Sequence, residues 1–138
     1  MNTLLLAADG SRARLFVHRG AHDFELLMSW DSPQARQLPH EANSDKNGSF
    51  QGSAYAPEVD AQQHAQQAFA RDLLGELKLR EKDFERVIIA APPKFLGELR
   101  SHLTPALSHK LSTLARDFTH LKANEVQQRL LEAETLNL

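Results

Sequence analysis

The sequence predicts a single α/β domain in which helices cover a mixed β-sheet. Two observations support this prediction. The first thirty or so residues hold a short apolar run and two further strand-like segments, whereas the chain after residue 60 switches between helical and strand periodicity. Three antiparallel strands followed by alternating helices and strands are typical of such a sheet. The 138 residues suffice for one domain, residues 1–138, with its own core.

The chain opens with a predicted β-hairpin. Residues 3–8 form a short apolar run, Asp9-Gly10 is a strong two-residue turn signal, and residues 12–18 alternate. In this second strand, one face is predicted to carry Ala13, Leu15 and Val17. The opposite face is predicted to carry Arg12, Arg14, Phe16 and His18. A third strand follows Gly20, with one face predicted to carry Phe24, Leu26, Met28 and Trp30.

Regular periodicity then stops from Ser32 to about Glu58. The segment is polar and is interrupted by prolines at positions 33, 39 and 57. A connection of this length inside a compact domain is usually functional or disordered. We therefore predict a mobile loop at about residues 32–58. Its candidate contact residues are Gly48, Ser49, Phe50, Gln51, Gly52 and Tyr55.

Helices and strands alternate in the second half of the chain. A helix is predicted over residues 60–80, and the unbroken apolar run 86–91 is typical of a strand buried on both faces. Pro92-Pro93 ends that strand and opens a helix, and Pro105 starts a short helical turn. A weaker strand over 111–119 and a helix over 125–132 complete the order. This order matches the ribonuclease H-like class.

Composition narrows the possible functions. The formal net charge of −2 argues against a protein that coats nucleic acid, and the absence of cysteine excludes disulfides and thiolate metal sites. The apolar run at residues 4–8 is too short for a signal peptide or a membrane span. We expect a cytoplasmic protein without a membrane span.

The basic face of the predicted hairpin is the best candidate binding site. The guanidinium groups of Arg12 and Arg14 suit phosphate, and an adjacent aromatic ring, Phe16, could stack on a base beside His18. We predict nucleic-acid or anion binding by these residues. The alternative interpretation is a solvated sheet face, or ion pairs with Glu25 and Asp31 on the next strand.

Catalytic and metal-binding patterns are weak. Asp9 stands where ribonuclease H-class nucleases place their first metal carboxylate, but the strand over 86–91 supplies no second acid, and a hairpin turn is the simpler interpretation. The seven histidines form no pair or cluster at ligand spacing. No serine has the setting of an activated nucleophile. We predict no catalytic residue, no metal and no cofactor.

Short sequence strings along nearly the whole chain resemble the host-attachment family, small bacterial proteins required for attachment to host cells. The strings are Ala8-Asp9-Gly10-Ser11-Arg12-Ala13-Arg14-Leu15-Phe16, Gly48-Ser49-Phe50, His64 with Phe69-Ala70, Ala91-Pro92-Pro93-Lys94-Phe95-Leu96-Gly97 with Leu99-Arg100, and Asp117-Phe118-Thr119-His120. The family is similar to the middle domain of archaeal and eukaryotic release factors and of Pelota. Release factors carry a Gly-Gly-Gln tip in the loop after the third strand, whereas Gln51 here follows Phe50.

Three functions remain open at this stage. We favour a non-enzymatic binding module that engages RNA, or the translation machinery including the ribosome, through the basic hairpin and the mobile loop. The first alternative is a hydrolase acting on a tRNA ester or on nucleic acid. The second is a protein-interaction factor in host attachment that uses a protein partner and no nucleic acid. The sequence leaves the oligomeric state open.

Overall fold

The structure is a computed structural model that describes residues 2–20, 23–35 and 52–137. Its centre is an open five-stranded sheet in the order β3-β2-β1-β4-β5. The strands are β1 (Asn2–Ala8), β2 (Arg12–Arg19), β3 (Glu25–Asp31), β4 (Arg86–Ala90) and β5 (Leu111–Leu114). β1, β2 and β3 pair antiparallel, whereas β1, β4 and β5 pair parallel. This mixed sheet confirms the predicted ribonuclease H-like fold.

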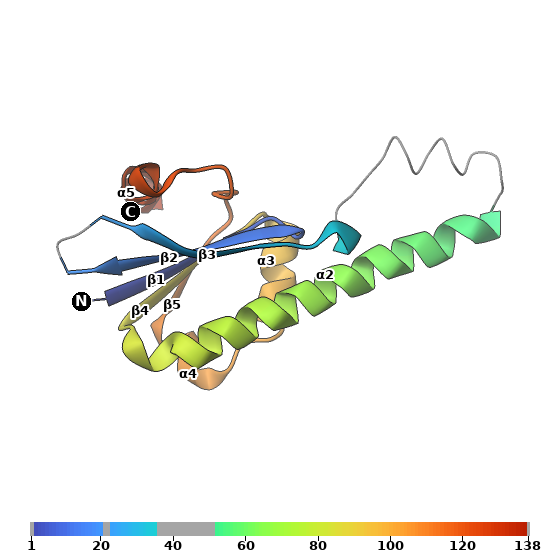
Figure 1. The fold of residues 1–138 in the computed structure, drawn as a ribbon, viewed down its shortest axis with the longest axis horizontal. Helices are drawn as coiled ribbons and strands as arrows, with labels where there is room; N and C mark the ends of the chain where they lie inside the picture. The colour runs from blue at the N-terminus through green and yellow to red at the C-terminus, as the bar shows by residue number, and fades with distance from the viewer. Residues whose placement is uncertain (1, 21–22, 36–51, 138) are drawn as a thin grey trace.

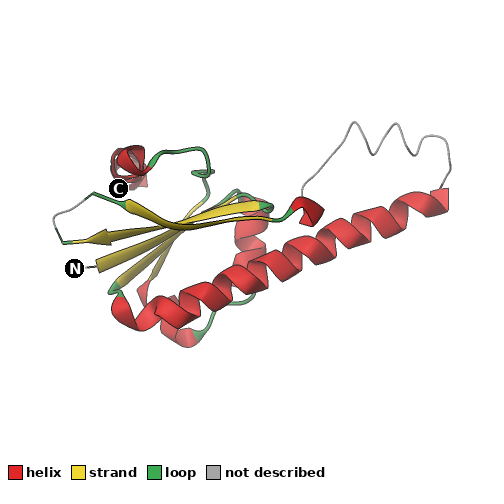
Figure 2. Ribbon diagram, viewed as in Figure 1, coloured by secondary structure: helices red, strands yellow, loops and turns green. Residues whose placement is uncertain are grey.

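Helices cover both faces of the sheet (Figure 1). They are α2 (Gly52–Arg80), α3 (Pro93–Arg100), α4 (Pro105–Lys110) and α5 (Ala123–Asn137), with short 3-10 turns η1 (Pro33–Ala35) and η2 (Glu81–Asp83). Helices α2, α3 and α4 lie on one face and α5 lies on the other, and α2 extends well beyond the end of the sheet (Figure 2). None of the described helices combines the length and apolar character needed to span a bilayer.

The two faces of the sheet have separate hydrophobic cores. Alternate residues of the central strands point to opposite sides, so Leu4 and Val87 pack beneath α2 and α3, whereas Leu5 and Ile88 pack beneath α5. All of these side chains are buried completely. The prediction that residues 86–91 form a strand buried on both faces is therefore confirmed.

The predicted face of β3 is wrong, because a bulge shifts the register. Leu15 pairs with Met28, but its neighbour Phe16 pairs with Leu26, so Leu27 is an extra residue in β3. One extra residue reverses the side-chain alternation beyond it. Phe24 consequently packs in the core beneath α5, while Met28 and Trp30 pack against the opposite core.

Three predicted boundaries also need correction. Helix α2 begins at Gly52 rather than at residue 60 and continues through Pro57, so the irregular segment does not extend to Glu58. Strand β5 ends at Leu114 rather than Thr119, because its partner β4 ends at Ala90 and no strand remains to pair with it. Helix α5 spans Ala123–Asn137, a longer range than the predicted 125–132.

The β1–β2 turn forms as the Asp9-Gly10 signal predicts. Gly10 has a φ of 102°, and a Cβ at this position would meet Gln66 of α2 at 3.6 Å and Phe95 of α3 at 3.8 Å. Those distances are ordinary contacts, so the requirement for glycine comes from the backbone angle. The turn therefore fits closely between the middle of α2 and the first turn of α3.

Replacing Gly10 with alanine should lower the free energy of unfolding by about 1–3 kcal/mol, because alanine is strained at positive φ. Gly97 is the matched control: it lies in α3 with open space where a Cβ would stand. Gly97→Ala should raise stability by about 0.5–1 kcal/mol. Urea unfolding of both variants measures the contrast. Equal effects at the two positions would show that backbone strain at the turn is unimportant.

Candidate functional site

The carboxylate of Asp9 closes the β1–β2 turn. Its Oδ1 accepts hydrogen bonds from the backbone N–H groups of Ser11 at 3.0 Å and Arg12 at 2.8 Å. The backbone N–H of Asp9 donates in return to the carbonyl of Arg12 at 3.0 Å. Within the described part of the chain, no group of three or more His, Asp or Glu residues is arranged to hold a metal ion. The contacts of Asp9 are thus those of a turn residue.

Arg14 holds the segment that follows β5 against the sheet. This half-buried side chain donates from Nη1 to the backbone carbonyl of Thr119 at 3.3 Å, and also to that of Leu121. Its guanidinium carbon lies 5.3 Å from the centre of the Phe16 ring. At least part of the hydrogen-bonding capacity of Arg14 is therefore used within the fold.

Phe16 and His18 lie on the same face of β2 as Arg14 but are not equally accessible. Phe16 is completely buried in the core beneath α5, so its ring has no free face on which a base could stack. His18 is half-buried, with its ring centre 4.9 Å from that of Phe24. The sequence grouped four residues on one binding face, and the structure leaves only Arg12 of that group exposed.

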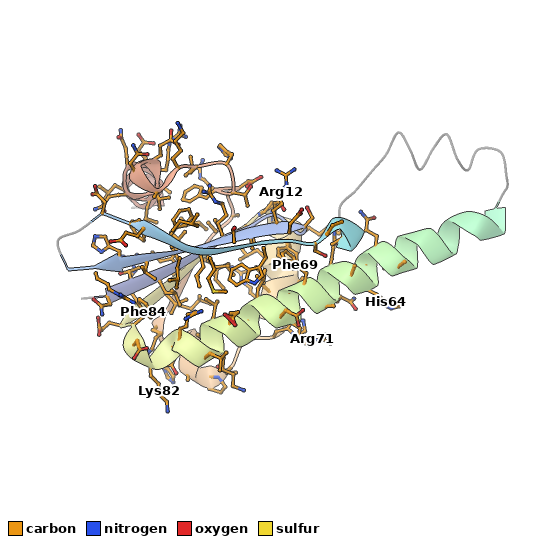
Figure 3. The ribbon with its side chains drawn as sticks, viewed as in Figure 1. Arg12, His64, Phe69, Arg71, Lys82 and Phe84 are labelled. Carbon is orange, nitrogen blue, oxygen red and sulfur yellow. The ribbon has the colours of Figure 1, made fainter. Side chains whose placement is uncertain are left out.

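Arg12 lines a hollow of about 410 Å³ at the start of β2 and the end of β3. The other lining residues are Ala13, Arg14, Ser29, Trp30, Asp31 and Thr119. Arg12 lies opposite Asp31 in the strand register, so the charge of Arg12 has an acidic neighbour. Figure 3 shows Arg12 on the opposite side of the sheet from Arg71 and Lys82.

Trp30 is the aromatic residue among those that line this hollow, but its side chain lies on the other face of the sheet from those of Arg12 and Arg14. Its indole is partly buried and packs against the core beneath α2 and α3, on the apolar face of β3 that the sequence pattern predicts. The strand register could have revealed this position, since Ala13 pairs with Trp30 and Arg12 pairs with Asp31. The hollow therefore combines an exposed guanidinium with the hydroxyl-bearing Ser29, whereas the indole of Trp30 lies on the other face of the sheet.

The predicted loop residues fall into two groups. Gly48, Ser49, Phe50 and Gln51 lie outside the described residues. Gly52 and Tyr55 belong to α2 rather than to a loop. The hollow at Arg12 consequently contains none of these predicted loop residues, and is lined only by residues of β2, β3 and the segment after β5.

The sheet order and its covering helices define an α/β protein of ribonuclease H-like topology with a hollow lined by two arginines at one end of β2 and β3. The chain belongs to a known family within this class. The model of the family described as "Protein required for attachment to host cells" matches residues 4–130. None of the curated proteins matches this chain.

Solved structures that are similar to this one are distant from it in sequence. An archaeal translation termination factor, aRF1, is 17% identical with a TM-score of 0.47 over 99% of this chain and 37% of its own. A structure described as an archaeal protein is also 17% identical, with a TM-score of 0.43 over 98% of this chain and 39% of its own. A chain of the PilM-PilN type IV pilus biogenesis complex is 17% identical, with a TM-score of 0.39 over 92% of this chain and 41% of its own. This chain therefore spans well under half the length of these solved chains.

Proposed function

We propose that the chain is a non-enzymatic binding module that engages single-stranded RNA, including RNA of the translation machinery, in the cytoplasm. The observation that carries the proposal is the hollow at the start of β2 and the end of β3, which the exposed side chain of Arg12 lines together with Arg14 and Ser29. A guanidinium binds phosphate through paired N–H donors, so the exposed Arg12 can hold a phosphate of an RNA strand. The absence of cysteine is consistent with the cytoplasmic part of the proposal.

The geometry of the hollow favours a single strand over a duplex. The volume of about 410 Å³ suits one nucleotide rather than a double helix. Asp31 on the rim restrains the electrostatic attraction, so the proposed binding is weak and depends on Arg12.

A change at Arg12 provides the sharpest test. Trp30 is the only tryptophan in the chain and is among the residues that line this hollow, so its fluorescence reports on binding there. Adding a single-stranded oligoribonucleotide should quench that fluorescence, and Arg12→Gln should weaken binding roughly tenfold. The slope of log affinity against log salt should also fall by about 0.7, since one phosphate contact on a single strand is lost.

Arg71→Gln is the matched control for this titration. Arg71 is an exposed arginine of α2, and Figure 3 places it on the opposite side of the sheet from Arg12. It should leave both the quenching and the salt slope unchanged. Absence of quenching, or equal effects of the two variants, would disprove RNA binding at this hollow.

A second candidate function is association with a protein partner in host attachment. The observation that favours it is the free edge of β3, where Leu26 is 44% exposed and Leu27 is 42% exposed. An edge strand presents backbone donors and acceptors to which another strand can pair. Loss of RNA binding together with retention of a partner that contacts β3 would favour this candidate.

A further inference from the structure

A second hollow, of about 330 Å³, adjoins the segment that Arg14 holds. It lies between that segment and helix α5. Its floor is apolar and consists of the buried side chains of Phe118, Leu121 and Ala133. Its rim is charged and consists of Arg116, Asp117, His120, Arg129 and Glu132. These residues are all exposed, so a ligand could reach them from solvent.

The two carboxylates of the rim already have partners close by in the sequence. Asp117 Oδ1 accepts from the backbone N–H of Thr119 at 2.9 Å and from the hydroxyl of the same residue. Glu132 Oε2 accepts from Gln128 Nε2 at 3.5 Å. These contacts occupy acceptor positions of both acids within the protein itself.

The two arginines of the rim differ from the two carboxylates in their hydrogen bonding. Across residues 2–20, 23–35 and 52–137, the guanidinium groups of Arg116 and Arg129 have neither a hydrogen bond nor an ion pair with a described group. Each guanidinium carries five N–H donors in a planar fork. The rim therefore has a large surplus of donors on two separate elements, the segment after β5 and helix α5.

We propose that this hollow binds a phosphate group between Arg116 and Arg129. One guanidinium can occupy both oxygens of a carboxylate, whereas a phosphate offers further oxygens to a second guanidinium. The apolar floor can cover the uncharged part of a ligand. The site shares no residue with the hollow at Arg12 and Trp30, so this proposal is independent of the proposed RNA-binding site.

Nuclear magnetic resonance of the arginine side chains tests the site directly. Inorganic phosphate is titrated against the full chain, with chloride used to keep the ionic strength constant. The Nε–H signals of Arg116 and Arg129 should move along a saturating curve. Arg116→Gln and Arg129→Gln should each weaken phosphate binding about tenfold, because each removes charge-assisted hydrogen bonds.

Two controls keep the experiment interpretable. Arg71→Gln removes an exposed arginine of α2 and should leave the phosphate affinity unchanged. Both test residues are exposed, so their variants should melt at the same temperature as the parent chain. Shifts that stay linear in phosphate, or an undiminished affinity in the double variant Arg116→Gln, Arg129→Gln, would overturn the proposal.

The source of the phosphate is decided by a second titration with a single-stranded oligoribonucleotide. If the double variant loses affinity for both probes, the phosphate belongs to a nucleic-acid backbone. If it loses affinity only for inorganic phosphate, the ligand is a small phosphorylated molecule. Both results support the site, and the Arg12→Gln titration reports separately on the proposed RNA-binding function.

Discussion

Truncation of Ile88 to alanine should lower the free energy of unfolding by about 2–5 kcal/mol, one of the two largest effects that we predict. Ile88 is completely buried at the middle of β4, where it pairs with Leu5 on one side and Ser112 on the other. Its side chain packs beneath α5 in the same core as Phe16. A strand hydrogen-bonded on both sides has little freedom to collapse into the cavity that truncation leaves.

Leu79→Ala is the control for this prediction. Leu79 lies on α2 and is 78% exposed, so its truncation should change stability by less than about 0.5 kcal/mol. Urea unfolding monitored by circular dichroism measures both variants. A loss at Ile88 as small as that at Leu79 would show that β4 is peripheral, contrary to the sheet order.

Arg14→Met should cost about 1.5–3 kcal/mol, because it removes charged donors from the carbonyls of Thr119 and Leu121. Methionine retains much of the apolar stem of arginine, so the effect isolates the hydrogen bonds. Amide hydrogen exchange should also become faster at Leu121, whose N–H donates to the carbonyl of Phe118 at 3.1 Å.

Arg12→Met is the matched control for Arg14→Met, since Arg12 lies on the same face of β2 but is exposed. It should leave stability and exchange at Leu121 almost unchanged. If the two variants behaved alike, the contact between β2 and the segment after β5 would be of no energetic importance. This comparison also explains why RNA binding is best tested at Arg12, where a change does not disturb the fold.

The parts of the fold that depend on local sequence were predictable. The dipeptide Asp9-Gly10 predicts the β1–β2 turn, because glycine accepts the φ of 102° that the turn requires. The run Val87-Ile88-Ile89 indicated a strand buried on both faces, because only such a strand lacks polar positions. Both predictions rest on neighbouring residues alone.

The bulge in β3 and the boundaries of β5 depend on a partner strand, and the sequence does not specify that partner. Leu26 and Leu27 are equally apolar, so no periodicity shows which of them is the extra residue. The end of β5 is determined by the end of β4, which lies more than twenty residues earlier in the chain. The local sequence pattern therefore predicts neither the position of the bulge in β3 nor the end of β5.

The candidate site was only partly predictable for the same reason. Arg12 could be identified as an exposed cation of a strand, whereas Arg14 is held by carbonyls 105 and 107 positions away. Phe16 alternates with apolar residues as a surface aromatic would, but α5 covers it from the far end of the chain. The position of Trp30 at the rim of the hollow follows from the register of β3.

Because β1 pairs parallel with β4, the sheet cannot be completed during synthesis until β4 has left the ribosome. The hydrogen bonds that join Asn2 to Glu85 connect positions 83 residues apart, so β1 leaves the ribosome long before its second neighbour. The β1–β2–β3 meander can form at once, since its turns are local. Until β4 arrives, it exposes an unpaired strand edge and two apolar faces, a combination that favours aggregation. Slow translation between β3 and β4 should therefore reduce the yield of native protein more than a pause after β5.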